Sequence, residues 1–298
     1  MATIHEPVLL KEVIDYLEPG PGKNYIDCTF GGGGHSLEIL SRVKPEGKVV
    51  GIDWDPAVVK NSSNENLILI NDNYKNLKKI YQQVRENGIE RIDGILLDLG
   101  LSSDQLGSRD RGFSFNDGGI LDLRFNTNSD ILTAADILAN YSQQELFKIF
   151  NEYGEDPLAW KIAKEIVEQR NKGNKIETVE MLVQLVSNAY KRHFKSKSKK
   201  NPATRIFQAL RIAVNDELGN IKSVLPQAID ILNPGGRIAI ISFHSLEDRI
   251  VKNYFRDESK RDYPRLKLVT KKPIVASEEE ISKNPRSRSA KLRVAEKI

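Results

Sequence analysis

The sequence predicts an α/β fold: a mainly parallel sheet with crossover helices, interrupted by a helical insertion. Three observations predict it. Short apolar runs rich in β-branched residues alternate with helical stretches between residues 24 and 99. Residues 106–202 then lack convincing strands, and strand character returns only at 237–242. A chain of 298 residues also suits one large α/β domain, or one domain with an insertion.

The first half of the predicted sheet comes from the runs 24–28, 48–53, 66–70 and 94–99. A helical stretch follows the first run through Ser41, and another covers 77–85. The run 94–99 is apolar enough to be buried on both faces, as strands of a parallel sheet are. Strands that alternate with helices in this way predict βαβ units.

The middle of the chain is predicted to be helical, because apolar residues recur at three- and four-residue spacing in 134–138, 143–153, 158–169 and 178–190. A helix-like segment at 205–232 then ends at the Asn-Pro-Gly-Gly turn of 233–236. Two strand candidates, 266–270 and 290–295, close the chain. We therefore expect a first part of the α/β domain at 1–106, an inserted helical domain at 107–202, and a second part at 203–298.

Composition narrows the class of protein. No apolar stretch reaches the roughly 18 residues of a transmembrane helix, and the N-terminus lacks the pattern of a signal peptide. The single cysteine, Cys28, cannot form an intrachain disulfide, so we expect a cytoplasmic protein with no membrane partner. The net charge is only +4, but residues 191–200 hold six Lys or Arg and no acid, and 283–292 are also basic. Such runs can neutralise phosphates, although charge alone favours a solvated loop.

A glycine-rich loop joins the first predicted strand to a helix: Asp-Cys-Thr-Phe-Gly-Gly-Gly-Gly-His-Ser at residues 27–36. Glycines there let the backbone approach a ligand, and the helix N-terminus offers free N–H groups. Asp53 ends the next strand, where a carboxylate commonly accepts hydrogen bonds from both ribose hydroxyls of an adenosine cofactor. The loop alone is compatible with a tight turn, but loop and acid together predict a nucleoside cofactor.

Two details favour S-adenosylmethionine over NAD. The four consecutive glycines lack the G-x-G-x-x-G spacing that suits a pyrophosphate. The two closing strand candidates match the antiparallel hairpin of methyltransferase sheets, whereas a nicotinamide enzyme more often continues with another βαβ unit. We therefore expect a class I, Rossmann-like, S-adenosylmethionine-dependent methyltransferase sheet with an inserted helical domain. A nicotinamide oxidoreductase and a non-catalytic RNA-binding protein of the same fold remain alternatives.

Aromatic and polar residues follow other predicted strands, at the edge where ligands bind. Tyr74 can stack on an adenine or be a partly buried loop aromatic. Asp98 ends a buried strand, which tolerates an acid only if the acid is paired or used. Phe243 can stack on a base, and His244 can contact a base or a phosphate, although an isolated histidine is as often structural. His244 has acidic neighbours but no second histidine at ligand spacing, so we expect no metal.

Nine segments in order resemble the RsmH (MraW) family, bacterial enzymes that methylate N4 of a cytosine in 16S ribosomal RNA. They are HEPVLLKEV at 5–13, DCTFGGGGHS at 27–36, GIDWDP at 51–56, DGILLDLGLSSDQL at 93–106, RGFSF at 111–115, LDLRF at 121–125, NPATRIFQALRIAVNDEL at 201–218, ISFHSLEDRIVK at 241–252 and NPRSRSAKLRVAEK at 284–297. Any one could arise by chance, but nine in this order make the resemblance specific.

The resemblance implies a class I domain interrupted by a helical domain, S-adenosylmethionine as cofactor, and cytidine 1402 of the small ribosomal subunit as substrate. It implies cofactor contacts at Gly33, Gly34, His35, Asp53, Tyr74, Asp98 and Gln105. This chain departs from the family at Cys28, where Gly is usual, and at Gly32, where Arg is usual. It also departs at Ile120 and Phe125, in a loop that the resemblance places on the substrate side.

Methylation of a cytosine amine needs an acceptor that orients the amine more than it needs a strong base. Asp98 or a nearby backbone carbonyl can serve, whereas Ser102 and Ser103 more readily cap a turn. Asn215 lies in the helical stretch 211–218, either on a solvated face or, as the resemblance implies, on the substrate side; His244 is the third catalytic candidate.

The expected RNA contacts are Lys195, Lys199, Arg205, Phe243, Arg286 and Arg288. The sequence is also compatible with a homodimer.

Overall fold

The computed structural model describes residues 7–59, 64–86, 88–101, 105, 110–115, 119–194 and 201–298. The chain forms two compact units: Met1–Ser102 with Leu218–Ile298, and Ser103–Glu217. The first unit is therefore made of two separate stretches of chain, and the second is inserted between them. In the part of the chain described, no helix has both the length and the apolar character needed to cross a membrane.

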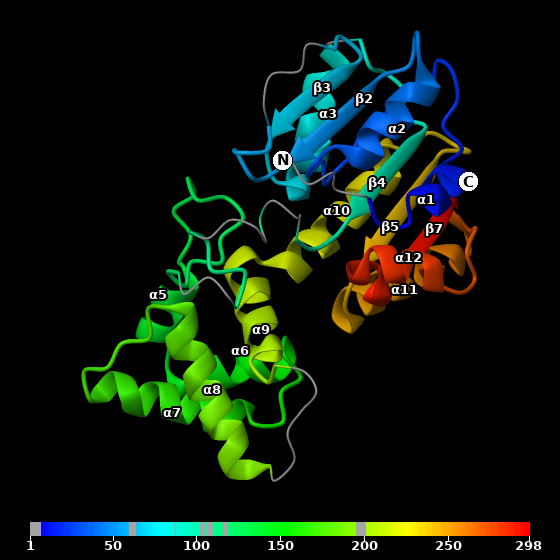
Figure 1. The fold of residues 1–298 in the computed structure, drawn as a ribbon. Coiled ribbons are helices and arrows are strands. Elements are labelled where there is room, and N and C mark those ends of the chain that lie inside the picture. The colour runs from blue at the N-terminus through cyan, green and yellow to red at the C-terminus, as the bar shows by residue number, and fades with distance from the viewer. Residues whose placement is uncertain are drawn as a thin grey trace. The chain divides into compact units, whose positions relative to one another are not determined.

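The first unit is built on a seven-stranded sheet in the order β3-β2-β1-β4-β5-β7-β6 (Figure 1). The strands are β1 Tyr25–Asp27, β2 Val49–Asp53, β3 Leu67–Asn71, β4 Gly94–Asp98, β5 Arg237–Ser242, β6 Leu266–Leu268 and β7 Lys291–Lys297. β1 to β5 pair in parallel, and β7 lies antiparallel between β5 and β6. The predicted class I sheet, with its closing antiparallel hairpin, is confirmed.

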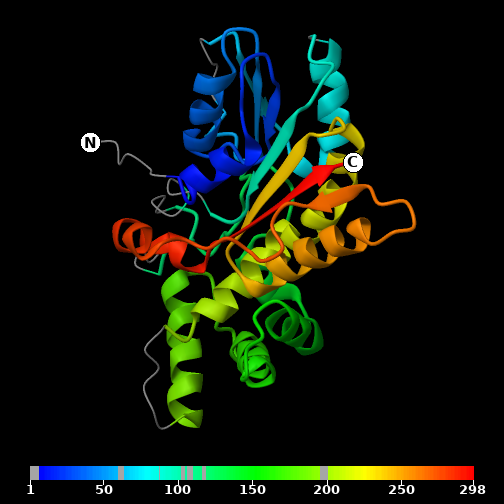
Figure 2. The same cartoon turned by 90° about the vertical axis from the view of Figure 1, so that its right-hand side faces the viewer.

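Two hydrophobic cores cover the two faces of this sheet. Alternate strand residues point to opposite faces, so Ile26, Val50 and Ile95 join one core while Tyr25 and Val49 join the other. The first core is completed by α3 Leu77–Glu86, α10 Glu217–Ile231 and α11 Ser245–Ser259, and the second by α1 Leu10–Leu17 and α2 Gly34–Val43. Figure 2 shows these two groups of helices on opposite sides of the sheet. Shorter elements are η1 Tyr74–Asn76, α12 Glu278–Lys283 and η2 Pro285–Ser289.

The second unit is helical, as the spacing of apolar residues predicts. Its named helices are α5 Ala134–Asn140, α6 Gln143–Glu152, α7 Ala159–Asn171, α8 Val179–His193 and α9 Thr204–Asn215. α9 packs against α5 and α6. For this reason the unit extends to Glu217, whereas the sequence placed the end of the insertion at residue 202.

The helix-like segment 205–232 is two helices rather than one. α9 ends at Asn215, its C-cap Asp216 has the left-handed conformation (φ 48°), and α10 begins at Glu217. Neither a glycine nor a proline marks the break, and Pro226 lies inside α10 instead. Apolar spacing on both sides is helical, so it could not reveal the interruption.

Candidate functional site

The glycine loop between β1 and α2 turns through left-handed backbone. Gly31 (φ 50°) and Gly33 (φ 77°) adopt conformations that other residues rarely reach. A Cβ on Gly33 would lie 2.8 Å from the ring of Phe30, and a Cβ on Gly34 would lie 2.3 Å from Pro7. Packing within the chain therefore already requires Gly33 and Gly34, which were predicted as cofactor contacts.

Asp53, predicted to bind a ribose, stands at the carboxyl end of β2 beside this loop. Its Oδ2 accepts a hydrogen bond from the backbone N–H of Gly31 (2.8 Å), and its Oδ1 accepts one from Asp55 (2.8 Å). Each carboxylate oxygen has a second acceptor site, so Asp53 can still receive two hydroxyl groups. Burial raises the pKa of Asp53 to about 6 despite these two hydrogen bonds.

Asp27, at the end of β1, is an acid that the sequence interpretation did not single out. The hydroxyl of Ser36 (2.7 Å) and the backbone N–H of Thr29 (3.1 Å) donate to its carboxylate. Burial raises its pKa. Thr29 also accepts from the backbone N–H of Asp98 at 2.6 Å and so links the ends of β1 and β4. The rule that identified Asp53, an acid closing a predicted strand, would also have found Asp27.

Asp98, the predicted acceptor, lies at the carboxyl end of β4 close to His35. Nε2 of His35 is 3.0 Å from the carbonyl oxygen of Val8, which can only accept, so Nε2 carries the proton. Nδ1 of His35 then faces Oδ2 of Asp98 at 3.7 Å. The other oxygen, Oδ1, is buried and has no hydrogen-bond partner among the described residues. Burial raises the pKa of Asp98 well above its ordinary value.

These carboxylates share one edge of the sheet and repel one another. The charge of Asp27 raises the pKa of both Asp53 and Asp98, and the charge of Glu247 adds to the shift at Asp98. Because burial and repulsion act together, ionisation of the carboxyl groups at this edge is disfavoured. A bound cation would relieve that repulsion, so the arrangement suits a positively charged ligand.

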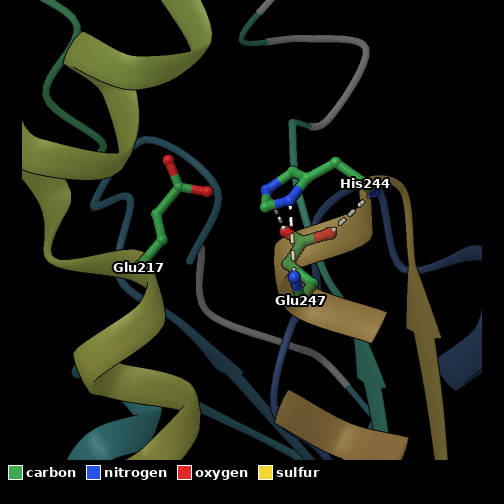
Figure 3. A group of neighbouring side chains, drawn as sticks. All are labelled: Glu217, His244 and Glu247. Atoms are coloured by element: carbon green, nitrogen blue, oxygen red, sulfur yellow. Dashed lines mark hydrogen bonds and ion pairs between the residues drawn. The ribbon is translucent and has the colours of Figure 1, made fainter. Parts of the chain in front are cut away.

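Phe243 and His244 follow β5 at the same edge, where they were predicted. His244 is the N-cap of α11: its Nδ1 accepts from the backbone N–H of Glu247 (3.4 Å), and Glu247 accepts from the backbone N–H groups of Phe243 (2.8 Å) and His244 (3.2 Å). Figure 3 shows His244 beside Glu247. Nε2 of His244 is 3.1 Å from Oε1 of Glu247 but is not aligned for a hydrogen bond, and it makes no hydrogen bond to the described residues.

In the second unit, the buried side chain of Asn215 holds a loop rather than facing solvent. Its Oδ1 accepts from the backbone N–H of Phe125 (2.8 Å), and its Nδ2 donates to the carbonyls of Leu123 (2.7 Å) and Arg211 (2.9 Å). A solvated face for Asn215, one of the two interpretations of the sequence, is therefore wrong. Gln105, a predicted cofactor contact, is buried in this unit.

The remaining predicted contacts are spread over both units. Tyr74 begins η1 after β3 and packs partly buried against the first core. Arg205 is exposed on α9 and donates to the carbonyl of Glu155 (3.1 Å). Arg286 and Arg288 are exposed on η2. Ser102, Ser103, Lys195 and Lys199 lie outside the described residues.

Comparison with known proteins gives consistent matches along the whole chain. A model of the MraW methylase family matches residues 2–298. A protein of Thermomicrobium roseum named ribosomal RNA small subunit methyltransferase H is 45% identical, covering 100% of this chain and 95% of the relative. Proteins of the same name from Carboxydothermus hydrogenoformans and Dictyoglomus thermophilum are 43% and 47% identical, over 99% of this chain and 98% and 97% of theirs.

Solved structures are more distant. An rRNA methylase from Streptococcus thermophilus is 13% identical, with a TM-score of 0.44 and coverage of 100% of this chain and 99% of that one. Fibrillarin from Aeropyrum pernix, with natively bound S-adenosyl-L-methionine, is 10% identical with a TM-score of 0.38, over 93% of this chain and 67% of fibrillarin. Similarities this weak say nothing about the chemistry of the present chain.

Proposed function

Because the chain belongs to the MraW methylase family and is therefore an S-adenosylmethionine-dependent methyltransferase, we propose that it methylates N4 of a cytidine in 16S ribosomal RNA. The relatives at 43–47% identity, named for the small ribosomal subunit, support RNA of that subunit as substrate. The finer target, cytidine 1402, is what the resemblance of the nine segments to the family implies. We also propose that the enzyme acts in the cytoplasm, where small subunits are assembled.

One observation carries the cofactor assignment: the carboxylates of Asp27, Asp53 and Asp98 gather at one sheet edge with raised pKa values. S-adenosylmethionine supplies an activated methyl group on a positively charged sulfonium. A cation at this edge offsets the mutual repulsion of the acids, whereas the pyrophosphate of NAD would add to it. The residues present therefore fit the sulfonium cofactor better than the nicotinamide alternative.

Asp53 orients the cofactor in this proposal. Its carboxylate stands at the end of β2, with one backbone N–H already donated to each oxygen. Two further acceptor sites match the two hydroxyls of a ribose. Asp53 must be ionised to accept from both, so this contact depends on pH.

Asp98 is proposed to orient the target amine. Its buried Oδ1 lacks a partner, and an N–H of the cytosine amine would supply one. An acceptor there would direct the nitrogen lone pair away from the carboxylate and toward the methyl group that the bound cofactor would supply. The amine proton then leaves to Asp98 or to water. His35 lies beside Asp98, with Nδ1 3.7 Å from Oδ2, and keeps its own Nε2 on the carbonyl of Val8.

The base and the RNA backbone are proposed to be held by neighbouring groups. Nε2 of His244, which makes no hydrogen bond to the described residues, can donate to a base carbonyl or a phosphate, and Phe243 offers an aromatic face. The target base would have to leave its stack to reach the edge. Asn215 acts through the loop at 123–125 that it holds, so we propose it as a positioning residue.

The test is mass spectrometry of the modified nucleosides. Purified enzyme, small subunits from cells that lack the gene, and methyl-labelled S-adenosylmethionine should yield N4-methylcytidine at position 1402. A label on another base, or on another atom of cytidine, would contradict the proposal. RNA binding without transfer of label would favour the non-catalytic alternative.

A further inference from the structure

A cavity of about 610 Å³ lies in the first unit, between α3 and the end of α10 and beside the loop that enters β5. Its volume is within the roughly 300–1,000 Å³ that is usual for ligand sites. Its cationic lining residues are Lys78, Arg85, Arg265 and Lys297, and Asp230 is the one carboxylate that joins them in the described part of the chain. The proposed methyl-transfer site uses none of these residues.

Helix α3 supplies one wall of the cavity. Three of its apolar residues are buried in the core: Leu77, Ile80 and Val84. Lys78, Tyr81 and Arg85 follow one another at three- and four-residue spacing, so they share the opposite face and line the cavity. The amphipathic pattern of α3 thus places two cations and an aromatic ring along one line.

Two of the cations are held by the protein itself. The guanidinium of Arg265 pairs with Glu258 at 2.7 Å and with Asp230 at 3.3 Å. Nζ of Lys297 donates to the carbonyls of Asp230 (3.2 Å) and Leu232 (2.5 Å) at the end of α10. Two carboxylates offset the charge of Arg265, whereas the carbonyls fix the ammonium of Lys297 in place at the floor of the cavity.

The cations on α3 are different, because neither Lys78 nor Arg85 has an acidic partner among the described residues. Arg85 lies over the ring of Tyr81, 5.8 Å from its centroid, and the hydroxyl of Tyr81 donates to the carbonyl of Glu90 (2.7 Å). The backbone N–H of Lys78 donates to Gln227 on α10 at 2.8 Å. The wall is therefore fixed in place while its two charges remain unpaired.

We propose that this cavity binds phosphodiester groups of the RNA substrate, away from the base that is methylated. The inference rests on the proposed function. β5 has six residues, so its two ends are roughly 20 Å apart: the cavity loop enters one end and His244 follows the other. RNA is repelled by the carboxylates of the transfer edge, so its attraction must come from cations elsewhere.

The spacing of the unpaired charges favours an RNA strand over a small anion. Lys78 and Arg85 are seven residues apart in one helix, which corresponds to roughly 10 Å along its axis. A single phosphate would need both long side chains to converge on it, whereas a strand with repeated phosphates can engage the two charges separately.

The experiment compares charge reversals on one helix. Lys78→Glu and Arg85→Glu should each weaken binding of a fluorescein-labelled 16S RNA fragment about tenfold near 0.1 M KCl and lower the log–log salt slope by about 1. Lys79→Glu is the matched control, because Lys79 is exposed on α3 but does not line the cavity. In methyl transfer, KM for RNA should rise in the two cavity variants while kcat stays near that of the wild type. Affinity for S-adenosylmethionine should not change.

Two outcomes would overturn the inference. In one, the cavity variants match Lys79→Glu in affinity and salt slope, so that only overall charge matters. In the other, inorganic phosphate or AMP binds at the cavity while RNA binding is unaffected, which would make it a small-anion site. The binding assay reports on the cavity even if the wild type transfers no methyl group to 16S RNA, an outcome that would count against the proposed function alone.

Discussion

The carboxylate of Asp53 has both a structural role and a proposed functional role. Its two oxygens hold the backbone of the glycine loop and of the turn after β2, while burial raises its pKa to about 6. A carboxyl with this pKa is ionised at pH 8 and largely protonated at pH 5. Cofactor affinity is therefore tied to a titration close to neutrality.

We expect affinity for S-adenosylmethionine to fall as the pH drops through 6, by up to about tenfold per pH unit below it. The protonated group can accept fewer hydroxyl hydrogen bonds and no longer attracts a cation. Isothermal titration calorimetry between pH 5 and pH 8 measures this. Asp53→Ala should abolish binding, and Asp53→Asn should bind weakly at every pH. An Asn variant with the pH profile of the wild type would show that another group titrates.

Asp98 should lower the stability of the fold progressively as the pH rises above its unfolded-state pKa. Its pKa is raised in the folded protein, so it destabilises the native state above that pKa, and the penalty disappears as the pH falls toward the unfolded value. Asp98→Asn should therefore raise the free energy of unfolding at pH 8, with little effect near pH 4, while methyl transfer falls. Urea unfolding at both pH values tests this.

Asp248 provides a control of opposite sign. Burial opposes ionisation of Asp248, but its contact with Arg293 at 2.6 Å lowers its pKa overall. Asp248→Asn should lower the free energy of unfolding at pH 8, because it leaves Arg293 without its charged partner. Equal effects of the two substitutions would contradict this account of the edge.

Among the elements, capping decides where several helices begin. α6 starts at Ser142, whose side chain accepts from the backbone N–H of Glu145 while Glu145 accepts from the N–H of Ser142. Ser142→Ala should lower the free energy of unfolding by about 1 kcal/mol. Gln144→Ala, at an exposed position in the same turn, should change it by less than about 0.5 kcal/mol. Thermal or urea unfolding followed by circular dichroism distinguishes the two.

The sequence predicted most strands and helices, because their apolar spacing is set by burial on a sheet or on a helix bundle. It did not predict α11, although His244 and Glu247 stand three residues apart as in a capping box, because His244 was not considered as a helix cap. The sequence interpretation also joined α9 to α10. The left-handed residue between them is an aspartate, which does not signal a helix end as a glycine or a proline would.

Site residues were predictable where their position follows directly from the topology of the sheet. Acids at strand ends were found at Asp53 and Asp98, since the carboxyl ends of parallel strands share one edge. Asn215 shows the limit of this reasoning. Its partners, Leu123 and Phe125, lie about ninety residues away in the chain, and periodicity within a helix carries no information about such contacts.

For the whole molecule, ligand binding should appear as thermal stabilisation. S-adenosylmethionine at 100 times its dissociation constant should add about 2.7 kcal/mol to the native state. In a chain of 298 residues, at about 2.1 cal/mol/K per residue, that corresponds to about 4 °C in Tm. Differential scanning fluorimetry with S-adenosylmethionine or NAD at equal concentrations tests it. A shift with NAD alone would favour the oxidoreductase alternative.

The split of the sheet around the second unit also governs how the chain is made. β4 pairs with β5, yet roughly 140 residues separate them, which at 5–20 residues per second amounts to about 7–28 s of translation. Throughout that interval the nascent chain presents the free hydrogen-bonding edge of β4, and such edges pair readily with other chains. Crowded polysomes that synthesise this protein should therefore depend on chaperones that shield a half-built sheet.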